Sequence, residues 1–334
     1  MEVKRLFDLI PNQLEKFPLT VAFAGKEKGK WITYSSHEFK KNSDLISYGL
    51  LAKGIQRGDK IAIISNNRPE WNFTDLGILQ TGAIDVPIYP TVSEHDLRFI
   101  LNDADVKFIF VSSEEIYQKI NKFSQELKDL KGIFTYNRVE GVPHWTELLE
   151  IGEKNKDEKK LEAIKDTIVA GDLATLLYTS GTTGNPKGVM LSHDNLVSNF
   201  VSVQHLPPVK AGDKVLSFLP LNHIYERMLT YLYMYLSTSI YYAESMETIG
   251  DNIREVQPTA FSAVPRLIEK VYDKIVSKGA ELTGVKRALF FWALNLGLKF
   301  DPNKDGGFLY NFELKLANKI IFPKWREALG GNLK

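Results

Sequence analysis

The sequence predicts an α/β protein made of two similar, doubly wound α/β subdomains that pack together. Residues 60–112 alternate between apolar, strand-like runs and capped helical segments, which is typical of a parallel sheet covered by helices. A second alternation follows, and its segment AGDKVLSFLP at 211–220 echoes RGDKIAIIS at 57–65. A charged stretch with few large apolar side chains separates the two halves. We therefore expect a first subdomain with an N-terminal hairpin at 1–152, a charged helix or linker at 153–170, and a second subdomain at 171–334.

Composition narrows the class of protein. Of the 334 residues, 44% are hydrophobic, which is enough for a sizeable core. The 42 basic and 41 acidic residues leave a net charge of +1, so the composition gives no sign of a nucleic-acid-binding protein. The chain has no cysteine, which excludes disulfides and thiolate chemistry.

No segment predicts secretion or a membrane span. Residues 1–16, MEVKRLFDLIPNQLEK, carry charges where a signal peptide needs an apolar core. The longest apolar run, residues 288–298, is interrupted by Asn295 and Gly297 and is far shorter than the roughly 20 residues of a transmembrane helix. We expect a cytoplasmic protein without a transmembrane segment. Peripheral contact with a membrane and the oligomeric state stay open.

The first half begins with a hairpin and continues with alternating strands and helices. Apolar runs at 21–24 and 31–34 flank the turn GKEKGK. Ser35 and Glu38 form a capping box for a helix that ends near Gly54. The elements that follow are a strand at 60–65, a polar turn at 66–68, a helix that opens with Pro69, a strand at 84–88, a helix capped by Ser93 and a strand at 106–112.

The second half repeats this scheme after an additional hairpin. Strand ends at 176–178 and 189–191 enclose a polar decamer, which predicts a hairpin loop. The remaining elements are a helix at 193–206, a strand at 214–219, a helix at 223–238, strands at 240–245 and 259–264, a helix at 266–279 and helices between 283 and 330.

The loop of that additional hairpin has the composition of a polyphosphate site. It lies in the stretch YTSGTTGNPKGVMLSH, which runs from Tyr178 to His193. Gly181, Gly184 and Gly188 allow positive φ and a close approach of the backbone, hydroxyls add donors, and one lysine adds charge. We expect a nucleotide to bind at Thr179, Ser180, Gly181, Thr182, Thr183, Gly184 and Lys187.

Two other interpretations of this loop are weaker. A conventional P-loop NTPase would need the pattern G-x-x-x-x-G-K-[ST] and a loop that leads into a helix, whereas this loop leads into a strand. An ordinary surface turn rich in Ser, Thr and Gly does not require a lysine after a proline or so many hydroxyls.

A second polar cluster lies in FLPLNHIYERM, where a strand end turns into a helix. Asn222 is the predicted N-cap, and His223 is expected in the first turn. A helix N-terminus favours anions and a neutral histidine, so His223 could donate to a carboxylate. The alternative is an ordinary histidine of a cap region. We interpret Glu226 and Arg227 as an ion pair or as contacts at the helix end.

The helix after His223 is apolar almost all round, which predicts burial on every side. Core packing explains each of its side chains. The alternative is a slot for an alkyl chain, lined by Tyr225, Met228, Tyr231 and Met234.

TSGTTGNPKG after Tyr178 resembles the phosphate loop of the adenylate-forming (AMP-forming) acyl-CoA synthetases. GIQRGDKIAIISNNRPEW, GAIDVPIYPT and SEHDLRFILNDADVK are similar to N-terminal segments of that family, and FLPLNHIYERM and SAVPRLIEKVYDKI resemble its long-chain fatty acyl members. The resemblance implies ATP-dependent conversion of a long-chain fatty acid to acyl-adenylate and then to acyl-CoA, with release of AMP and pyrophosphate. ATP, the fatty acid and CoA are the implied substrates, and Mg²⁺ is the implied metal.

The resemblance also implies the roles of single residues. Thr182, Thr183 and Lys187 would hold the β and γ phosphates, and Thr179 would help to ligate Mg²⁺. His223 would lie beside the acyl carboxylate. Lys187 and His223 are thus the expected catalytic residues, and the expected substrate-binding residues are His223, Tyr225, Met228 and Val264.

The sequence departs from the family at its end. After LGGNLK, no Y-G-x-T-E segment, no later aspartate for the ribose and no C-terminal domain with its lysine follows, so the chain looks like the N-terminal part of a longer enzyme. We expect it to fold alone but not to turn over substrate. An enzyme that loads an acyl carrier protein would share the same loop, and a non-catalytic ATP- or acyl-binding module is a further alternative.

Overall fold

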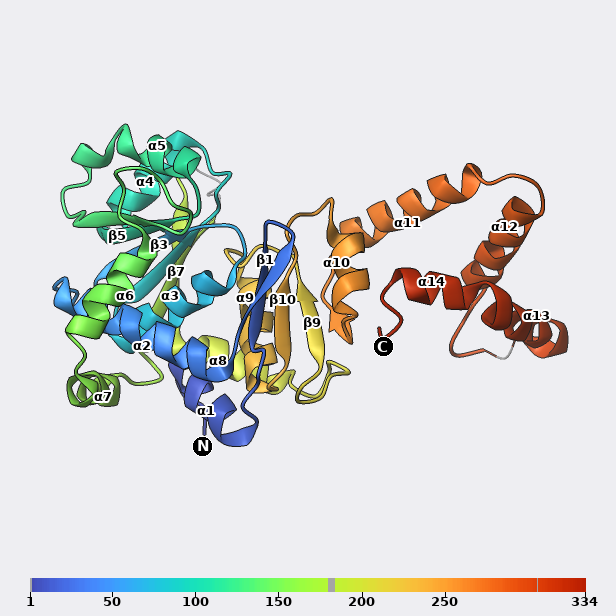
Figure 1. The fold of residues 1–334 in the computed structure, drawn as a ribbon, viewed down its shortest axis with the longest axis horizontal. Helices are drawn as coiled ribbons and strands as arrows, with labels where there is room; N and C mark the ends of the chain where they lie inside the picture. The colour runs from blue at the N-terminus through green and yellow to red at the C-terminus, as the bar shows by residue number, and fades with distance from the viewer. Residues whose placement is uncertain (1, 180–183, 305) are drawn as a thin grey trace. The chain divides into compact units, whose positions relative to one another are not determined.

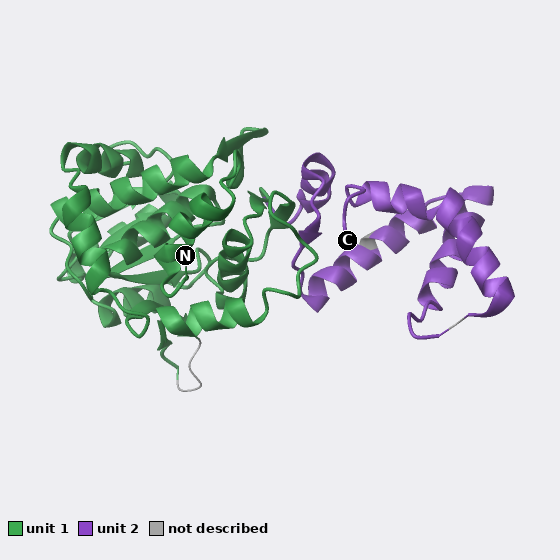
Figure 2. Ribbon diagram, turned by 90° about the horizontal axis from the view of Figure 1, so that it is seen from below, with its two compact units in different colours: residues 1–244 green, residues 245–334 purple. Residues whose placement is uncertain are grey.

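The computed structural model describes residues 2–179, 184–304 and 306–334. The chain divides into two compact units, residues 1–244 and residues 245–334, and each is described by itself (Figures 1 and 2). Unit 1 is an α/β body, and unit 2 is mainly helical. The polyphosphate hairpin and His223 both lie in unit 1.

Unit 1 contains two mixed sheets and the helices that cover them. Its strands are β1 (Phe23–Glu27), β2 (Lys30–Tyr34), β3 (Lys60–Ile64), β4 (Ile84–Ile88), β5 (Val106–Val111), β6 (Gly132–Thr135), β7 (Leu173–Thr179), β8 (Lys187–Ser192), β9 (Lys214–Ser217) and β10 (Ser239–Tyr242). Its helices are η1 (Leu6–Asp8), α1 (Leu9–Lys16), α2 (Ser36–Ala52), α3 (Pro69–Gln80), α4 (Glu94–Asp103), α5 (Glu114–Asn121), η2 (Ser124–Glu126), α6 (Trp145–Lys154), α7 (Glu158–Thr167), α8 (His193–Ser202) and α9 (Ile224–Tyr235).

The larger sheet has the strand order β6-β5-β3-β4-β7-β8. All neighbouring strands are parallel except β7 and β8, which form an antiparallel hairpin at one edge. β3 comes first in the sequence and lies between β4 and β5, so the chain winds outward from it in both directions. This is the doubly wound arrangement that the sequence predicts.

Helices cover both faces of the larger sheet because alternate side chains of its strands point to opposite sides. On one face, α4, α5 and η2 pack onto apolar side chains of β3, β4 and β5, among them Ile64 and Val111. On the other face, Phe110 stacks with Tyr136, whose hydroxyl donates to Thr74 Oγ1 of α3 at 2.8 Å. α2 packs against α3 and α6 in this second layer. The helix that follows β3 and the helix that follows β5 therefore lie on opposite faces.

The smaller sheet runs β9, β10, β1, β2 within unit 1. β1 pairs in parallel with β10 and antiparallel with β2, with Phe23 opposite both Ile240 and Tyr34. The N-terminal hairpin thus belongs to the sheet built by the later strands β9 and β10. α9 packs against α1 and α8 beside it. A pairing across more than 200 residues leaves no local pattern in the sequence, so its partner strand could not be predicted.

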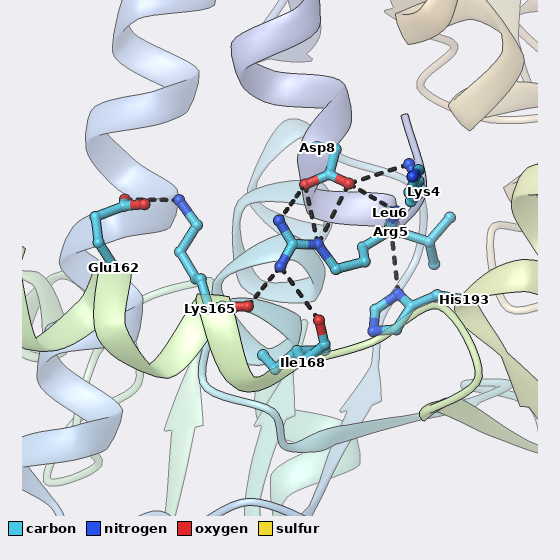
Figure 3. A network of polar contacts seen from close by, with 8 residues as sticks. All are labelled: Lys4, Arg5, Leu6, Asp8, Glu162, Lys165, Ile168 and His193. Carbon is cyan, nitrogen blue, oxygen red and sulfur yellow. Dashed lines mark hydrogen bonds and ion pairs between the residues drawn. The ribbon is translucent and has the colours of Figure 1, made fainter. Parts of the chain in front are cut away.

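A polar network ties the N-terminal segment to residues that precede and follow the hairpin of β7 and β8 (Figure 3). Arg5 Nη2 donates to Asp8 Oδ1 at 2.8 Å, and Arg5 Nη1 donates to the carbonyl oxygens of Lys165 and Ile168 at 2.5 and 3.2 Å. The backbone N–H of Leu6 donates to Nδ1 of His193 at 3.2 Å. These contacts hold the end of α7 with the segment that follows it, and the first residue of α8. The two held segments flank the hairpin on either side.

Unit 2 consists of α10 (Ile249–Val256), β11 (Ala260–Phe261), α11 (Pro265–Ala280), α12 (Gly284–Leu298), α13 (Gly307–Ile320) and α14 (Phe322–Ala328). Consecutive helices from α11 to α14 pack against each other, and α10 packs against α14. Several large apolar side chains of α13 are exposed, including Phe308 and Phe312. Even so, none of the described helices is both long enough and apolar enough to cross a membrane.

Most elements expected from the sequence are confirmed. The capping box of Ser35 and Glu38 opens α2, Pro69 opens α3, and Ser93 accepts from the backbone of Asp96 at the start of α4. Several elements are shorter than predicted; for example, α8 ends at Ser202, β9 ends at Ser217, and β11 contains only two residues. The charged segment at 153–170 contains α7 and lies inside unit 1, so it does not separate the two compact units; the subdomain division itself stays a prediction.

Candidate active site

The polyphosphate loop lies at the tip of the hairpin formed by β7 and β8. Tyr178 is opposite Gly188 and Thr179 is opposite Lys187, which confirms the predicted hairpin. Gly184 has a φ of +103°, a backbone conformation that glycine adopts without strain. Four predicted phosphate ligands lie outside the described residues: Ser180, Gly181, Thr182 and Thr183.

Thr179 and Lys187 present exposed side chains at the open end of this hairpin. The hydroxyl of Tyr178 donates to Asp103 Oδ2 at 2.6 Å, which holds β7 against α4. The φ of Gly188 is not positive, contrary to the prediction, and a Cβ at this position would lie 3.2 Å from the Tyr178 ring, a tight contact that would require a small shift of the ring. The contacts of Tyr178 thus hold the backbone of the hairpin in place. Lys187 has no ion pair within the described part of the chain.

His223 is the N-cap of α9, and the prediction that it lies in the first turn is wrong. Its Nδ1 accepts from the backbone N–H of Tyr225 at 3.2 Å, so a neutral ring carries its proton on Nε2, where it can be donated. Asn222, the predicted N-cap, is buried instead. Its side chain donates to the carbonyl oxygen of Ser65 at 3.0 Å and accepts from Trp71 Nε1 at 3.3 Å. These partners lie far away in the sequence, which is why a local pattern misplaced the cap.

Asn67 fixes the loop that leads to His223. Its Nδ2 donates to the carbonyl oxygen of Leu219 at 2.7 Å, and its Oδ1 accepts from the N–H of Leu221 at 2.9 Å. The sequence explained Asn67 as part of a turn and gave no signal for this second role. Both contacts join the end of β3 to the loop between β9 and α9, so Asn67 positions the histidine.

A pocket of about 770 Å³ lies between the hairpin and the start of α9. Thr179, His223, Tyr225 and Met228 line it together, so the structure brings these candidates to one site. Most of its other wall is apolar and comes from α4, β7 and β8, including Ile100, Leu177 and Val189. The predicted slot residues Tyr231 and Met234 are not among those that line it, because both are buried in the core.

Arg227 is fully buried and joins α9 to three other elements. Its Nη2 lies 2.6 Å from Asp75 Oδ1 of α3 and 2.9 Å from Asp85 Oδ2 of β4. Nη1 donates to Thr175 Oγ1 of β7 and Nε donates to the hydroxyl of Tyr231, both at 2.7 Å. The expected ion pair between Glu226 and Arg227 is therefore wrong. The network instead fixes α9 relative to β7, the strand that leads into the polyphosphate loop.

Burial raises the pKa of carboxyl groups near α9. It raises the pKa of Asp85 well above its usual range and also raises that of Asp75, while the nearby Arg227 guanidinium lowers both. Burial also raises the pKa of Glu226 to about 7. Ser217 Oγ donates to Glu226 Oε1 at 2.5 Å, which favours the ionised form and limits that rise.

The AMP-binding enzyme family matches residues 10–297, most of the length of this chain. The chain belongs to the AMP-binding enzyme family. The hairpin of β7 and β8 and the residues that line the pocket beside α9 all lie within the matched region.

Relatives of this chain include long-chain-fatty-acid–CoA ligases. It is 30% identical to ACSBG2 of Xenopus laevis, over 97% of this chain and 46% of that protein. It is also 30% identical to human ACSBG2, over 99% of this chain and 51% of that protein. The chain thus spans about half the length of these relatives, which fits the expectation of an N-terminal part.

Solved structures share the fold. A long-chain-fatty-acid-CoA ligase from Archaeoglobus fulgidus matches with a TM-score of 0.70 and 22% identity, covering 82% of this chain and 54% of that one. VinN in complex with L-aspartate matches with a TM-score of 0.67 and 20% identity, covering 83% of this chain and 66% of that one. At these identities the likeness shows the fold alone. It confirms the predicted fold class and does not choose between substrates.

One predicted substrate-binding residue belongs to unit 2. Val264 is the N-cap of α11 in unit 2 and is 40% exposed. Its expected role at an acyl pocket stays a prediction, because unit 2 is described separately from unit 1.

Proposed function

We propose that this chain carries the phosphate-binding and acyl-binding part of a long-chain fatty acid–CoA ligase. In the complete reaction, the fatty acid carboxylate attacks the α-phosphorus of ATP and pyrophosphate leaves; the CoA thiol then displaces AMP from the acyl-adenylate. The observation that carries the proposal is the pocket of about 770 Å³, whose apolar wall adjoins both the polyphosphate hairpin and His223. Because relatives of this chain are named long-chain-fatty-acid–CoA ligases, we propose a fatty acid as the substrate in preference to other carboxylic acids.

The apolar part of the pocket suits an alkyl chain. Ile100, Leu177 and Met228 line it, and a volume in this range can enclose most of a small ligand. Met228 is unbranched and adaptable, so it can follow an alkyl chain closely. Burying such a chain contributes about 0.8 kcal/mol per CH₂ group, which makes chain length the main determinant of affinity.

The polar part of the pocket suits the reacting carboxylate and the nucleotide phosphates. His223 Nε2–H donates to the carboxylate from the N-terminus of α9, where the helix dipole also favours an anion. Lys187 and the loop N–H groups balance the charge that moves onto the leaving pyrophosphate. The protein supplies no nucleophile, since the two substrates react with each other once they are aligned.

Magnesium would be held mainly by the nucleotide. Among the described residues no group of three or more His, Asp or Glu side chains could hold a metal ion, and Thr179 offers a single hydroxyl. Mg²⁺ keeps several waters and commonly binds through substrate phosphates, so one protein hydroxyl at the hairpin is compatible with a metal that arrives with ATP. When bound, it would neutralise phosphate charge.

We further propose that this chain alone does not turn over substrate. Its relatives are about twice as long, and a transition state that develops charge needs donors on several sides. Among the described residues, the donors that we assign to the reaction come from the hairpin and from the start of α9 only.

The test is palmitate-dependent exchange of pyrophosphate into ATP by a protein that joins this chain to the remaining half found in its relatives. Exchange that requires palmitate and is lost in Lys187→Ala supports the proposal. Absence of exchange with any fatty acid contradicts it. Product analysis with CoA and with acyl carrier protein then identifies the acceptor. Acyl-hydroxamate formation by the isolated chain at a rate within about tenfold of the longer protein would contradict the claim that several donors are missing.

A further inference from the structure

Unit 1 contains a second, larger pocket that shares no lining residue with the first. It has a volume of about 1000 Å³ and lies at the carboxyl ends of β3, β5 and β6. Residues 66–68, 112–113 and 136–138 form its walls on that side. The turn between β1 and β2, the end of β10 and the start of α6 enclose it from the other side. No described residue of the polyphosphate loop lines it, and neither does His223.

The position of this pocket in the larger sheet is that of a ligand site. β3 and β5 are neighbours, and the chain leaves β3 into α3 on one face and leaves β5 into α5 on the other. The two connections diverge at this point and open a crevice beyond the carboxyl ends of the strands. Open α/β sheets bind their ligands in such crevices. The polyphosphate hairpin lies instead at the far edge of the same sheet, on β7 and β8.

The lining charges favour an anion. Of the three acidic side chains that line the pocket, Glu244 pairs with Lys26 at 3.2 Å, and Glu27 and Glu70 both pair with Arg68. Two further cations, Lys28 and Arg138, line the same pocket and have no acidic partner in the part of the chain that the structure describes. Both are exposed at its rim.

The floor of the pocket is rigid before any ligand arrives. The guanidinium of Arg68 lies 5.0 Å from the centre of the Tyr136 ring and donates to Asn137 Oδ1 at 3.0 Å. His144 Nε2 donates to the carbonyl oxygen of Tyr136 at 2.8 Å, and its Nδ1 lies 2.7 Å from Thr146 Oγ1. A floor held in this way loses little conformational entropy on binding.

One buried hydroxyl group of the wall has no hydrogen-bond partner among the described residues. Ser112 Oγ is buried and makes no hydrogen bond in the described structure. Ser113, which follows it, caps α5 by accepting from the N–H of Ile116, so the wall here is a helix N-terminus with a spare donor beside it. An unpaired buried hydroxyl costs free energy that a ligand oxygen could recover.

We infer that this second pocket binds a small organic anion of about nucleotide size. Lys28 and Arg138 pair with its phosphate or carboxylate group, and the start of α5 with Ser112 faces the same group from the wall. The inference does not depend on the proposed ligase activity, because no residue is shared between the two pockets.

The test follows the indole N–H resonance of Trp145, which lines the pocket, in the folded chain; Trp145→Phe assigns it. AMP and citrate are titrated separately, so that a phosphate and a carboxylate ligand are distinguished. We expect a saturable shift with at least one of them. The double variant Lys28→Gln with Arg138→Gln should weaken that binding by about tenfold or more, because two charge-assisted contacts are lost.

Lys187→Gln is the matched control, since it removes an exposed cation of the polyphosphate hairpin and leaves the second pocket intact. It should not change the Trp145 titration. Absence of a saturable shift with both anions would overturn the inference. So would a shift that survives the double variant, or one that is lost in Lys187→Gln, because the anion would then bind elsewhere. Lys28, Arg138 and Lys187 are all exposed and can be changed without loss of folding, which thermal unfolding verifies.

Discussion

Two charged regions of unit 1 use their charge in different ways. In one, Arg227 of α9 is fully buried, and its donors meet Asp75, Asp85, Thr175 and Tyr231. In the other, Lys187 at the start of β8 is exposed and lacks an ion pair among the described residues. The buried network fixes the elements, and the exposed groups are left to meet the ligand. The number of contacts that a charged residue makes is therefore a poor guide to its part in the chemistry.

The largest effect should come from breaking the buried network. Arg227→Leu leaves the Asp75 carboxylate buried without its cation, which costs about 3–5 kcal/mol of unfolding free energy. Urea unfolding of the chain measures it. Arg57→Leu is the matched control, because Arg57 pairs with Asp172 near the surface and such a pair contributes about 0–1 kcal/mol. Equal losses in the two variants would contradict the distinction between the regions.

Removing the exposed Lys187 should lower activity and leave stability unchanged. Lys187→Ala should lower palmitate-dependent ATP–pyrophosphate exchange by about 10²-fold, the usual cost of one preorganised donor, and leave the unfolding midpoint unchanged. Lys160→Ala removes an exposed lysine of α7 and should leave exchange unchanged. A loss of stability in Lys187→Ala comparable to its loss of activity would show that this lysine is structural.

A smaller effect is expected from filling the pocket. Met228→Trp adds a large side chain to the apolar wall and should raise the KM for palmitate by about tenfold while changing that for a short fatty acid less. Met246→Trp is its control, because Met246 is half exposed and lies in unit 2. An equal change for long and short acids would place the alkyl chain outside this pocket.

The smallest effect concerns the pH dependence of stability at His193. Burial lowers its pKa to about 4, below the roughly 6.5 of an unfolded histidine. Between about pH 4 and about pH 6.5, His193 is therefore protonated in the unfolded chain and neutral in the folded chain. Its contribution to the free energy of unfolding falls as pH drops from about 6.5 to about 4, by at most about 1.4 kcal/mol per pH unit. His193→Asn keeps an acceptor for the N–H of Leu6 and should flatten this slope in urea unfolding at several pH values (Figure 3).

Glu226 should give a pH dependence of stability opposite in sign to that of His193. Its pKa is raised to about 7 in the folded chain, above the roughly 4.3 of an unfolded glutamate. Stability from this group is present below the unfolded value and is lost as pH rises through about 7. Glu226→Gln should therefore remove a decline with rising pH. A flattened slope of the same sign in both variants would mean that burial does not control these pKa values.

Local signals in the sequence were sufficient for much of the fold. Ser35 with Glu38, Pro69 and Ser93 mark helix starts through contacts within four residues, and the hairpin of β7 and β8 follows from two apolar runs around a polar loop. The same signals could not place the hairpin of β1 and β2 in its sheet, because its partner β10 lies more than 200 residues later. What could be predicted from the sequence thus depended on how far apart the contacting residues are along the chain, more than on their types.

The site shows the same limit. Thr179, Lys187 and His223 were found from local composition and from resemblance, whereas Asn67 and Arg227 were explained as a turn residue and a helix-end contact. Their partners lie about 150 residues away and give no periodic signal. Tyr231 and Met234 were grouped with the slot residues because the helix is apolar all round, and only packing shows which of its faces is turned to the pocket.

The central claim is that the pocket between the polyphosphate hairpin and α9 holds an acyl chain whose carboxylate faces His223. Photolabelling of this chain with a non-hydrolysable palmitoyl-adenylate analogue, carrying a diazirine on the alkyl chain, tests it most directly. The account predicts a label on the peptides that contain Ile100 or residues 222–228, competition by the unlabelled analogue, and a reduced yield in Met228→Trp. A label spread over residues 245–334, or one that is unchanged in Met228→Trp, would contradict it.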